Sequence, residues 1–132
     1  PPMLGLLKAM VISGKSCKVV LGYNSADEMF MLEDFEQFSD DITVLTADGS
    51  YGQKGFVTDA FDKCEYACAC GPLSMLRALD HKVERGQFSL EARMGCGFGA
   101  CMGCSIRTTD GSQRVCKEGP VFDKEALRWE SL

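Results

Sequence analysis

The sequence predicts an α/β fold in which an incomplete, doubly wound parallel sheet is followed by a small cysteine-rich domain with a β-hairpin. Short apolar runs alternate with helical patterns over the first 90 residues, and turn residues follow each apolar run. Beyond residue 90 the helical periodicity stops, and glycine and cysteine dominate. We therefore expect two domains, at residues 1–90 and 91–132.

The first predicted elements are a helix, a strand and a second helix. Prolines suit the first turn of a helix over residues 1–14, and Gly14 suits its end. The apolar, β-branched run at 17–23 is typical of a buried parallel strand. Ser25 and Glu28 then have the spacing of a capping box, which predicts the start of a helix. One side of that helix would carry Met29, Leu32, Phe35 and Phe38.

The same alternation continues to residue 90. Apolar residues at 42–45 predict a second strand, which ends at an Asp48-Gly49 turn. Residues 54–61 predict a short helix, and 66–70 predict a third strand. Pro72 would then start a helix over residues 73–86 that Gly86 stops. Ligands of a doubly wound parallel sheet bind beyond the carboxyl ends of its strands, here residues 22–25, 48–55 and 70–75.

The amino-terminal helix has no strand before it. This order suggests a piece of a larger protein that begins just after the first strand and glycine turn of the sheet. The alternative is a small domain that simply starts with a helix. In either case the glycine-rich dinucleotide fingerprint is not part of this sequence.

Composition and charge narrow the range of partners. A chain of 132 residues is long enough for one ordinary domain, or one domain with a small appendage. Its net charge of −5 and pI near 4.8 argue against a nucleic-acid surface. No apolar run approaches the roughly 18 residues of a membrane span, and residues 3–12 lack the charged leader of a signal peptide. We expect a cytoplasmic protein with no membrane partner.

The glycine-rich segment at 94–105 carries the clearest chemical signal. Cys96, Cys101 and Cys104 have the spacing C-x4-C-x2-C, and Cys116 follows after eleven further residues. This is the plant-type arrangement in which four thiolates hold a 2Fe–2S cluster. A hairpin with its turn at Asp110-Gly111 would return Cys116 to the loop. The glycines of the loop permit the positive φ angles that a tight ligand loop needs; they are Gly95, Gly97, Gly99 and Gly103.

Two other readings of the cysteines remain open. A zinc site usually shows two C-x2-C pairs, whereas this segment has one. Disulfides would be reduced in the compartment that we expect. Cys17 and Cys64 suit small apolar positions, while Cys70 stands at a predicted strand end where a thiol could contact a bound cofactor.

Six segments carry a resemblance to a known family. They are "PPMLGLLKAM", "GYNSADEM", "DGSYGQKGFVTD", "CACGPLSMLRAL", "SLEARMGCGFGACMGCSI" and "VCKEGPVF". Together they resemble the electron-transfer subunits of two-subunit, NAD-dependent dihydroorotate dehydrogenases, which belong to the ferredoxin-reductase-like family. The resemblance implies a subunit with an FAD-binding barrel, an NAD-binding domain and a 2Fe–2S domain. The barrel is outside this sequence, so we expect the chain alone to be inactive.

The resemblance also implies a reaction and a partner. In such enzymes an FMN-containing catalytic subunit oxidises dihydroorotate in pyrimidine biosynthesis, within a heterotetramer. Electrons pass from FMN through the 2Fe–2S cluster to FAD and then, as hydride, to NAD. Because iron must come near the partner's FMN, we expect the apolar Phe98 and Met102 of the ligand loop to lie at the docking surface.

The family's functional residues map onto four groups. The cluster ligands would be Cys96, Cys101, Cys104 and Cys116. The first NAD-contacting group, on the adenosine ribose side, would be Gly22, Asn24 and Ser25. The second would be Asp48, Gly49, Ser50 and Gly52. The group beside the nicotinamide would be Cys70, Gly71, Pro72 and Met75. A neutral Asn24, where NADP-dependent relatives often carry a basic residue, favours NAD.

Two rival functions stay open at this point. One is the small subunit of a related NAD(P)H- or ferredoxin-linked flavin reductase, in which an aspartate is usually the first cluster ligand. The other is a non-catalytic binding module that zinc stabilises. Iron and sulfide content, together with the visible spectrum, separates the zinc module from both reductases.

Overall fold

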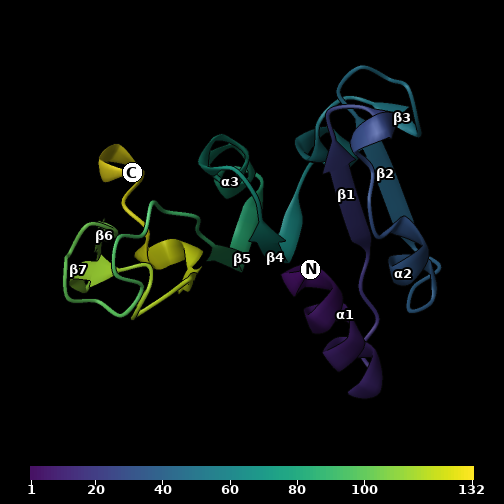
Figure 1. Cartoon of the computed structure of the whole chain (residues 1–132). Coiled ribbons are helices and arrows are strands. Elements are labelled where there is room, and N and C mark those ends of the chain that lie inside the picture. The colour runs from purple at the N-terminus through teal and green to yellow at the C-terminus, as the bar shows by residue number, and fades with distance from the viewer. The chain divides into compact units, whose positions relative to one another are not determined.

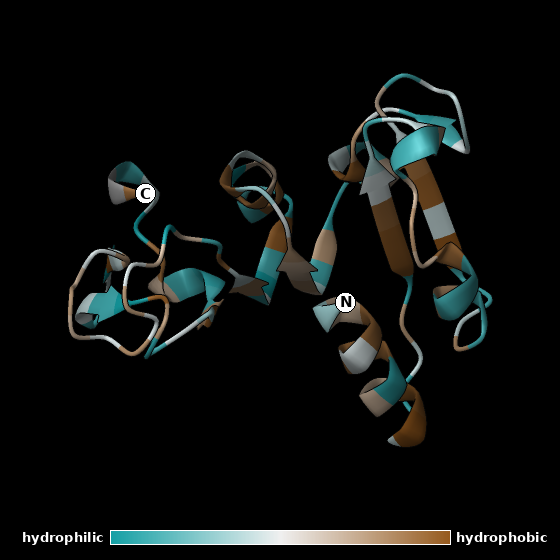
Figure 2. Cartoon of the chain, in the orientation of Figure 1, coloured by the Kyte–Doolittle hydropathy of each residue, from teal (hydrophilic) through white to brown (hydrophobic). Residues whose placement is uncertain are grey.

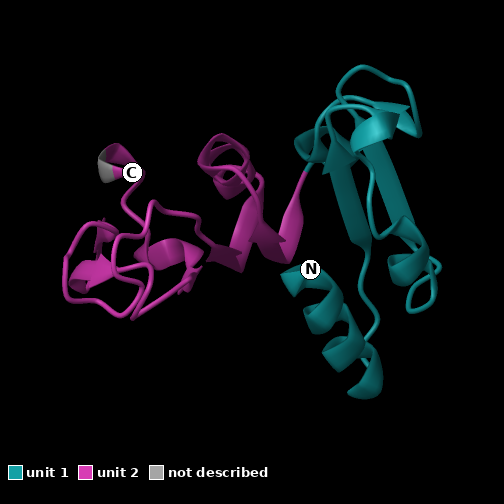
Figure 3. Ribbon diagram, viewed as in Figure 1, with its two compact units in different colours: residues 1–62 teal, residues 63–132 magenta. Residues whose placement is uncertain are grey.

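The computed structural model describes the backbone of residues 1–132 and every side chain except that of Ser131. The chain forms two compact units, Pro1–Asp62 and Lys63–Leu132 (Figure 3). The unit boundary lies earlier than the domain boundary expected at residue 90, because the third predicted strand forms a sheet of its own with later segments. The division into 1–90 and 91–132 stays a prediction.

Unit 1 contains a parallel sheet and the predicted amino-terminal helix (Figure 1). The helix α1 spans Pro2–Ile12, and the sheet has the order β1-β2-β3. Its first two strands, β1 (Val19–Tyr23) and β2 (Ile42–Thr46), pair in parallel along their whole length. The short β3 (Gln53–Lys54) adds to the carboxyl end of β2. The predicted parallel pairing of the first two strands is confirmed.

The core of unit 1 lies where α1 and the second helix meet the sheet. Leu4, Leu7 and Phe35 are its buried residues. Apolar residues of β1 and β2, coloured brown in Figure 2, face this cluster and supply part of its lining. The partly buried residues packed against it are Met3, Cys17, Val19, Leu21, Met31, Phe38 and Ile42. Cys17 is therefore a packing residue, as its sequence context suggests.

The second predicted helix is shorter than expected and is interrupted. A 3-10 turn, η1 (Ala26–Glu28), comes first, and the α-helix α2 covers only Leu32–Glu36. The predicted capping box is wrong, because the Ser25 side chain makes no capping hydrogen bond. Between the two pieces Met31 adopts a left-handed φ of 61°, which breaks the helix while its side chain packs on the core. The helix predicted at 54–61 is a single 3-10 turn, η2 (Val57–Ala60).

Unit 2 contains a mixed sheet and a separate hairpin. The sheet has the order β4-β5-β8 and comprises β4 (Cys64–Cys70), β5 (Val83–Ser89) and β8 (Val121–Asp123). β4 and β5 are parallel and are linked by the helix α3 (Leu73–Asp80), whereas β8 runs antiparallel to β5. The predicted hairpin is present as β6 (Ser105–Thr108) and β7 (Gly111–Arg114). Two 3-10 turns end the chain, η3 (Lys124–Ala126) and η4 (Trp129–Ser131).

The prediction that a helix continues to Gly86 is wrong. The helix ends at Asp80, and Gly86 lies in the middle of β5 opposite Ala67 of β4. A Cβ at this position would overlap the backbone carbonyl of Ala67, so the glycine serves close strand packing rather than helix termination. Val83 and Phe88 bury their side chains on this strand, with 3% and 0% of their surface exposed.

Lys124 fixes the junction between α3 and β5. Its ammonium donates to the carbonyl oxygens of Asp80 at 3.0 Å and Val83 at 2.7 Å. It also forms an ion pair with the Asp80 carboxylate at 3.4 Å.

Throughout the described part of the chain, no helix has both the length and the apolar character that a bilayer crossing requires.

Candidate functional site

The three-cysteine loop between β5 and β6 belongs to unit 2, and the β6–β7 hairpin carries the chain from this loop to Cys116. Gly97 and Gly99 have φ angles of 72° and 94°, so two of the four predicted glycines use their conformational freedom here. Met102 supplies a third left-handed position, with φ of 60°. These local reversals keep Cys96, Cys101 and Cys104 on one short loop.

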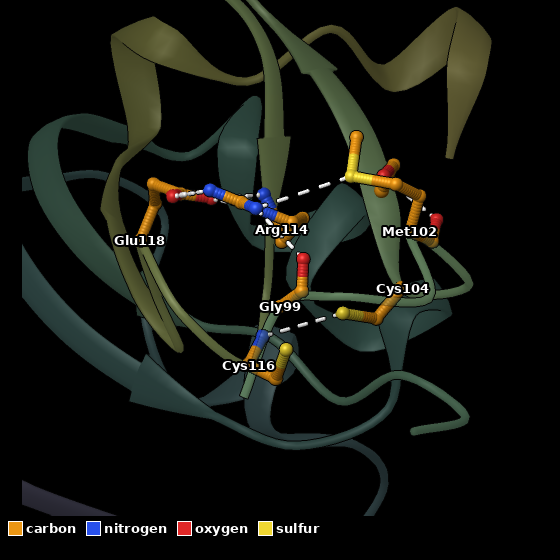
Figure 4. A network of polar contacts seen from close by, with 7 residues as sticks. Gly99, Met102, Cys104, Arg114, Cys116 and Glu118 are labelled. Carbon is orange, nitrogen blue, oxygen red and sulfur yellow. Dashed lines mark hydrogen bonds and ion pairs between the residues drawn. The ribbon is translucent and has the colours of Figure 1, made fainter. Parts of the chain in front are cut away.

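Backbone N–H groups of the loop point at the cysteine sulfurs. The N–H of Cys101 donates to Sγ of Cys96 at 3.5 Å, and the N–H of Gly103 donates to Sγ of Cys101 at 3.4 Å. On the hairpin side, the N–H of Cys116 donates to Sγ of Cys104 at 3.4 Å (Figure 4). The structure thus brings Cys96 close to Cys101, and Cys104 close to Cys116. N–H donors of this kind stabilise sulfur atoms that carry negative charge.

The same contacts shift the acidity of the thiols. The N–H of Cys101, followed by that of Phe98, lowers the pKa of Cys96 to about 6. The N–H of Cys116 lowers the pKa of Cys104. The pKa of Cys116 itself is raised, mainly by its side-chain hydrogen bond with Cys104. Each pair therefore combines one acidic thiol with a neighbour, and the thiolate is the form that binds metal.

The donor set fits an iron–sulfur cluster. Thiolates are the ligands that iron–sulfur clusters and tetrahedral zinc share, and the N–H groups aimed at the sulfurs suit either centre. Among the described residues, however, no three His, Cys, Asp or Glu side chains are gathered closely enough to hold a metal ion as they stand. The chemistry of the four thiols and their order in the loop, rather than a preformed cage, carries the assignment.

Exposure differs among the four cysteines. Cys104 is 5% exposed, whereas Cys101 is exposed and the other two are half-buried. Around them the loop displays Phe98 at 70% and Met102 at 51% exposure. Phe98 therefore does not pack into the interior of unit 2. An exposed phenyl ring beside the ligand loop is a feature of an interaction surface.

A second group of candidate residues lies at the carboxyl ends of β1 and β2 in unit 1. The Ser50 Oγ accepts from the N–H of Ala26 at 2.7 Å, and so links the loops that follow the two strands. Asp48 Oδ1 accepts from the N–H of Ser50 at 2.9 Å and from its hydroxyl at 2.6 Å. The Ser50 side chain is the main cause of a lowered pKa of Asp48. The Asn24 amide donates to the Glu28 carboxylate at 2.7 Å, so both polar groups stand beside the end of β1.

At this edge, backbone conformation or close packing requires glycine at three of the predicted positions. Gly49 and Gly52 have φ angles of 79° and 64°, and a Cβ on Gly52 would overlap the Val44 carbonyl. Gly22 lies in β1, where a Cβ would stand 2.5 Å from Cγ1 of Val57. Six of the seven residues predicted to contact NAD at this edge therefore lie on the two adjacent loops that follow β1 and β2. The seventh, Gly22, lies within β1 and packs against η2. Ser25 precedes η1 without using its hydroxyl as a cap.

Sequence reasoning missed Thr46 at this edge. Its side chain is fully buried, donates to the Tyr51 carbonyl at 2.7 Å and accepts from the Tyr51 N–H at 3.1 Å. Its carbonyl accepts from the N–H groups of Gly49 and Gly55. Thr46 therefore shapes the loop that presents Asp48. A buried polar residue at a strand end is the signal that could have identified it.

The third predicted group stands at the carboxyl end of β4 in unit 2. Cys70 is the last residue of β4, and Pro72 is the residue that precedes α3. Met75 folds back over the turn, so that a Cβ on Gly71 would stand 2.5 Å from its Cε and 3.1 Å from its Sδ. The structure brings these four residues together at one strand end. A half-buried glycine with a neighbouring thiol and thioether suits contact with a flat ring.

Residues 91–128 match the family model described as the iron-sulfur cluster binding domain of dihydroorotate dehydrogenase B. All four candidate cysteine ligands lie inside this segment. The chain is 39% identical to the electron transfer subunit of dihydroorotate dehydrogenase B (NAD(+)) of Bacillus cereus strain B4264, over 92% of this chain and 51% of the relative. The corresponding subunit of Bacillus anthracis strain CDC 684 / NRRL 3495 gives the same identity and coverage.

The chain is thus similar to the electron transfer subunits of dihydroorotate dehydrogenase B, and its residues 91–128 match the cluster-binding domain of that enzyme. It spans about half the length of the curated relatives that it matches. A chain of a solved NADH-dependent reduced ferredoxin-NADP oxidoreductase, studied for flavin-based electron bifurcation, is also similar, with a TM-score of 0.81 and 30% identity over 97% of this chain and 50% of that chain. The α/β fold with a parallel sheet and a cluster-binding domain is thus that of the ferredoxin-reductase-like proteins.

Arg114 and Glu118 form a polar network beside the cysteines that sequence reasoning also missed (Figure 4). Their hydrogen bond is the main cause of a raised pKa of Arg114, and the thiolates of Cys116 and Cys104 raise it further. Neither residue is part of the cysteine pattern by which the cluster ligands were predicted. Only the folded hairpin reveals that they face the ligand loop.

Proposed function

We propose that this chain is an electron-transfer component that binds a 2Fe–2S cluster through Cys96, Cys101, Cys104 and Cys116, and that works with FAD and NAD. A bound cluster supplies reversible one-electron transfer. The observation that carries the proposal is the convergence of N–H donors and acidic thiols at the cysteines of a segment that matches a cluster-binding family. The protein's own work is to hold, orient and shield the cofactors.

The two nucleotide loops support the NAD part of the proposal. In unit 1 the linked loops at Asn24–Glu28 and Asp48–Ser50 present carboxylates and a hydroxyl to any ligand beyond the strand ends. Carboxylates favour a ribose with free hydroxyls over one that carries a phosphate. We therefore assign these loops to the adenosine side of NAD, and the turn at Cys70–Met75 to the nicotinamide.

The similarity to dihydroorotate dehydrogenase B electron transfer subunits supports a proposed reaction and partner. We propose that electrons released when an FMN-containing subunit oxidises dihydroorotate reach NAD through this chain, as one step of pyrimidine biosynthesis. A heterotetramer with the catalytic subunit is the assembly we expect. Exposed Phe98 and Met102 support docking at the ligand loop. Eight free cysteines suit the reducing cytoplasm, where we place the reaction.

Iron and sulfide analysis of anaerobically purified protein tests the cluster. We expect red-brown protein with iron and acid-labile sulfide, and a rhombic EPR signal after one-electron reduction. Cys101→Ser should abolish or strongly weaken the signal, whereas Cys17→Ser should keep it because that thiol packs on the core of unit 1. Colourless protein that holds zinc after reconstitution with iron and sulfide would instead support the zinc-stabilised module. Zinc found only after aerobic purification decides nothing, since an emptied thiolate site takes up zinc.

A second function has one specific observation in its favour. The solved NADH-dependent reduced ferredoxin-NADP oxidoreductase is similar over almost the whole chain. The chain could therefore serve a related reductase that exchanges electrons with ferredoxin. Assays of the complete subunit with its partner separate the two functions, because only the dihydroorotate-linked enzyme reduces NAD when dihydroorotate is the sole donor.

A further inference from the structure

We propose that Arg114 is a positioning residue that ties the three-cysteine loop to the turn carrying Cys116, and thereby holds the two parts of the cluster site in register. The inference rests on the proposed cluster function. Arg114 ends β7, two residues before Cys116, while the other three cysteines lie on a loop before β6. Something must hold these separate segments at a fixed spacing.

The guanidinium of Arg114 reaches both segments (Figure 4). Its Nη1 donates to the carbonyl oxygen of Gly99 at 2.7 Å, between Cys96 and Cys101. Its Nε donates to Oε2 of Glu118 at 2.9 Å, and its Nη2 pairs with Oε1 of the same carboxylate. One rigid, planar group therefore joins the middle of the ligand loop to the turn that follows β7.

The backbone of Arg114 strengthens the same junction. Its N–H donates to Oε2 of Glu118 at 2.7 Å. Its carbonyl accepts from the N–H groups of Lys117, Glu118 and Gly119, so the turn that contains Cys116 wraps around it. The Arg114 and Glu118 side chains are 23% and 30% exposed, which limits the screening of their attraction by water.

Gly99 gives independent support for this contact. It is buried and has a φ of 94°, so a side chain there would be strained. A Cβ would also stand 3.2 Å from Nη1 of Arg114 and 2.8 Å from Cδ of Lys117. The absence of a side chain at position 99 lets the loop carbonyl meet the guanidinium directly. The loop is shaped to receive Arg114.

Charge gives Arg114 a second effect. The guanidinium carries a permanent positive charge, lies two residues before Cys116 in the chain and is hydrogen-bonded to the Gly99 carbonyl of the cysteine loop. A four-thiolate cluster gains negative charge when it accepts an electron, so a fixed cation nearby favours the reduced form. Removal of Arg114 should therefore loosen the site and lower the reduction potential. Lysine can restore the charge but not the three-way hydrogen bonding of a planar guanidinium.

Cluster retention and potential in the complete subunit test the inference. In Arg114→Met we expect the cluster to be lost to an iron chelator about 10- to 100-fold faster, the range found for removal of groups that orient metal ligands. The midpoint potential should fall and the EPR signal should change. Arg114→Lys should recover most of the potential and little of the retention. The matched control is Arg107→Met, which removes an exposed arginine of β6 and should leave all three readouts unchanged.

Glu118→Gln provides a second variant that keeps the acceptor oxygen and the size of the side chain. Because the neutral amide holds the guanidinium less firmly, we expect faster cluster loss than in wild type and slower loss than in Arg114→Met. Wild-type retention, EPR signal and potential in both Arg114→Met and Glu118→Gln would overturn the positioning role alone. Wild-type protein that holds no iron after anaerobic reconstitution with iron and sulfide would overturn the proposed function, and with it this inference.

Discussion

Replacement of Gly71 by alanine should slow NAD reduction strongly while it lowers the stability of the fold only slightly. An added Cβ would stand 2.5 Å from Cε and 3.1 Å from Sδ of Met75, the far end of a flexible side chain. The φ of Gly71 is not left-handed, so the backbone itself tolerates alanine. The cost in unfolding free energy should be about 1 kcal/mol, equivalent to a fall in Tm of about 4–8 °C for a unit of this size.

The same methyl group, with the displaced thioether, enters the space that we assign to the nicotinamide. A displacement of about 1 Å at a reacting centre costs up to about 100-fold in rate. In the complete subunit with its catalytic partner, we expect Gly71→Ala to lower NAD reduction by about 10- to 100-fold. Stopped-flow reduction of the cluster by dihydroorotate should keep its wild-type rate.

Gly86→Ala is the matched control for Gly71→Ala. It makes the same substitution in the same unit, but its Cβ overlaps the backbone carbonyl of Ala67 in the neighbouring strand. Backbone cannot move aside as Met75 can, so we expect a loss of about 2–3 kcal/mol of unfolding free energy. An equal loss of both half-reactions in Gly71→Ala, or an unchanged rate of NAD reduction, would refute the assignment of the nicotinamide site.

Three further predictions concern other parts of the chain. Lys124→Met should lower the free energy of unfolding by about 2–3 kcal/mol, because the carbonyls of Asp80 and Val83 lose a charged donor. Urea denaturation measures this loss, and a change below about 0.5 kcal/mol would contradict the prediction. Phe98→Ser should weaken binding to the catalytic subunit in calorimetry while the potential of the cluster stays unchanged, and normal binding with a labile cluster would reject docking there. The isolated 132-residue chain with added FAD should not oxidise NADH, so NADH consumption above a flavin-only blank would contradict the expectation.

The sequence predicted best those elements that depend on local rules. The helix over Pro2–Ile12, the parallel strands β1 and β2, and the β6–β7 hairpin follow from proline position, apolar runs and an Asp-Gly turn. Each pattern reports a preference of the segment itself. The cysteine spacing is also a local pattern, because a cluster requires a fixed residue type at each ligand position, and the ligand assignment drawn from it stays a prediction.

The errors arose where tertiary packing overrode a local signal. The position of Gly86 after a helical pattern predicts a helix stop, yet this glycine allows β5 to approach β4 closely. The buried Val83 and Phe88 could have indicated a strand, but the helical pattern from residue 73 masked them. The Ser25–Glu28 capping box failed for a related reason. Met31 turns left-handed and packs on the core, which ends the helix that the box would have started.

The positioning of the cysteine loop had no signal in the sequence at all. The acceptor on the loop is the carbonyl of Gly99, a group that every residue carries, and the donor lies fifteen residues later on β7. No spacing rule connects an arginine to a backbone oxygen at that separation, because the hairpin geometry creates the contact. Residue types therefore identify the candidate cluster ligands. The positions of those ligands in the fold depend on contacts such as the hydrogen bonds of Arg114. For this reason we expect variants of Arg114 to change retention and potential while every cysteine remains in place.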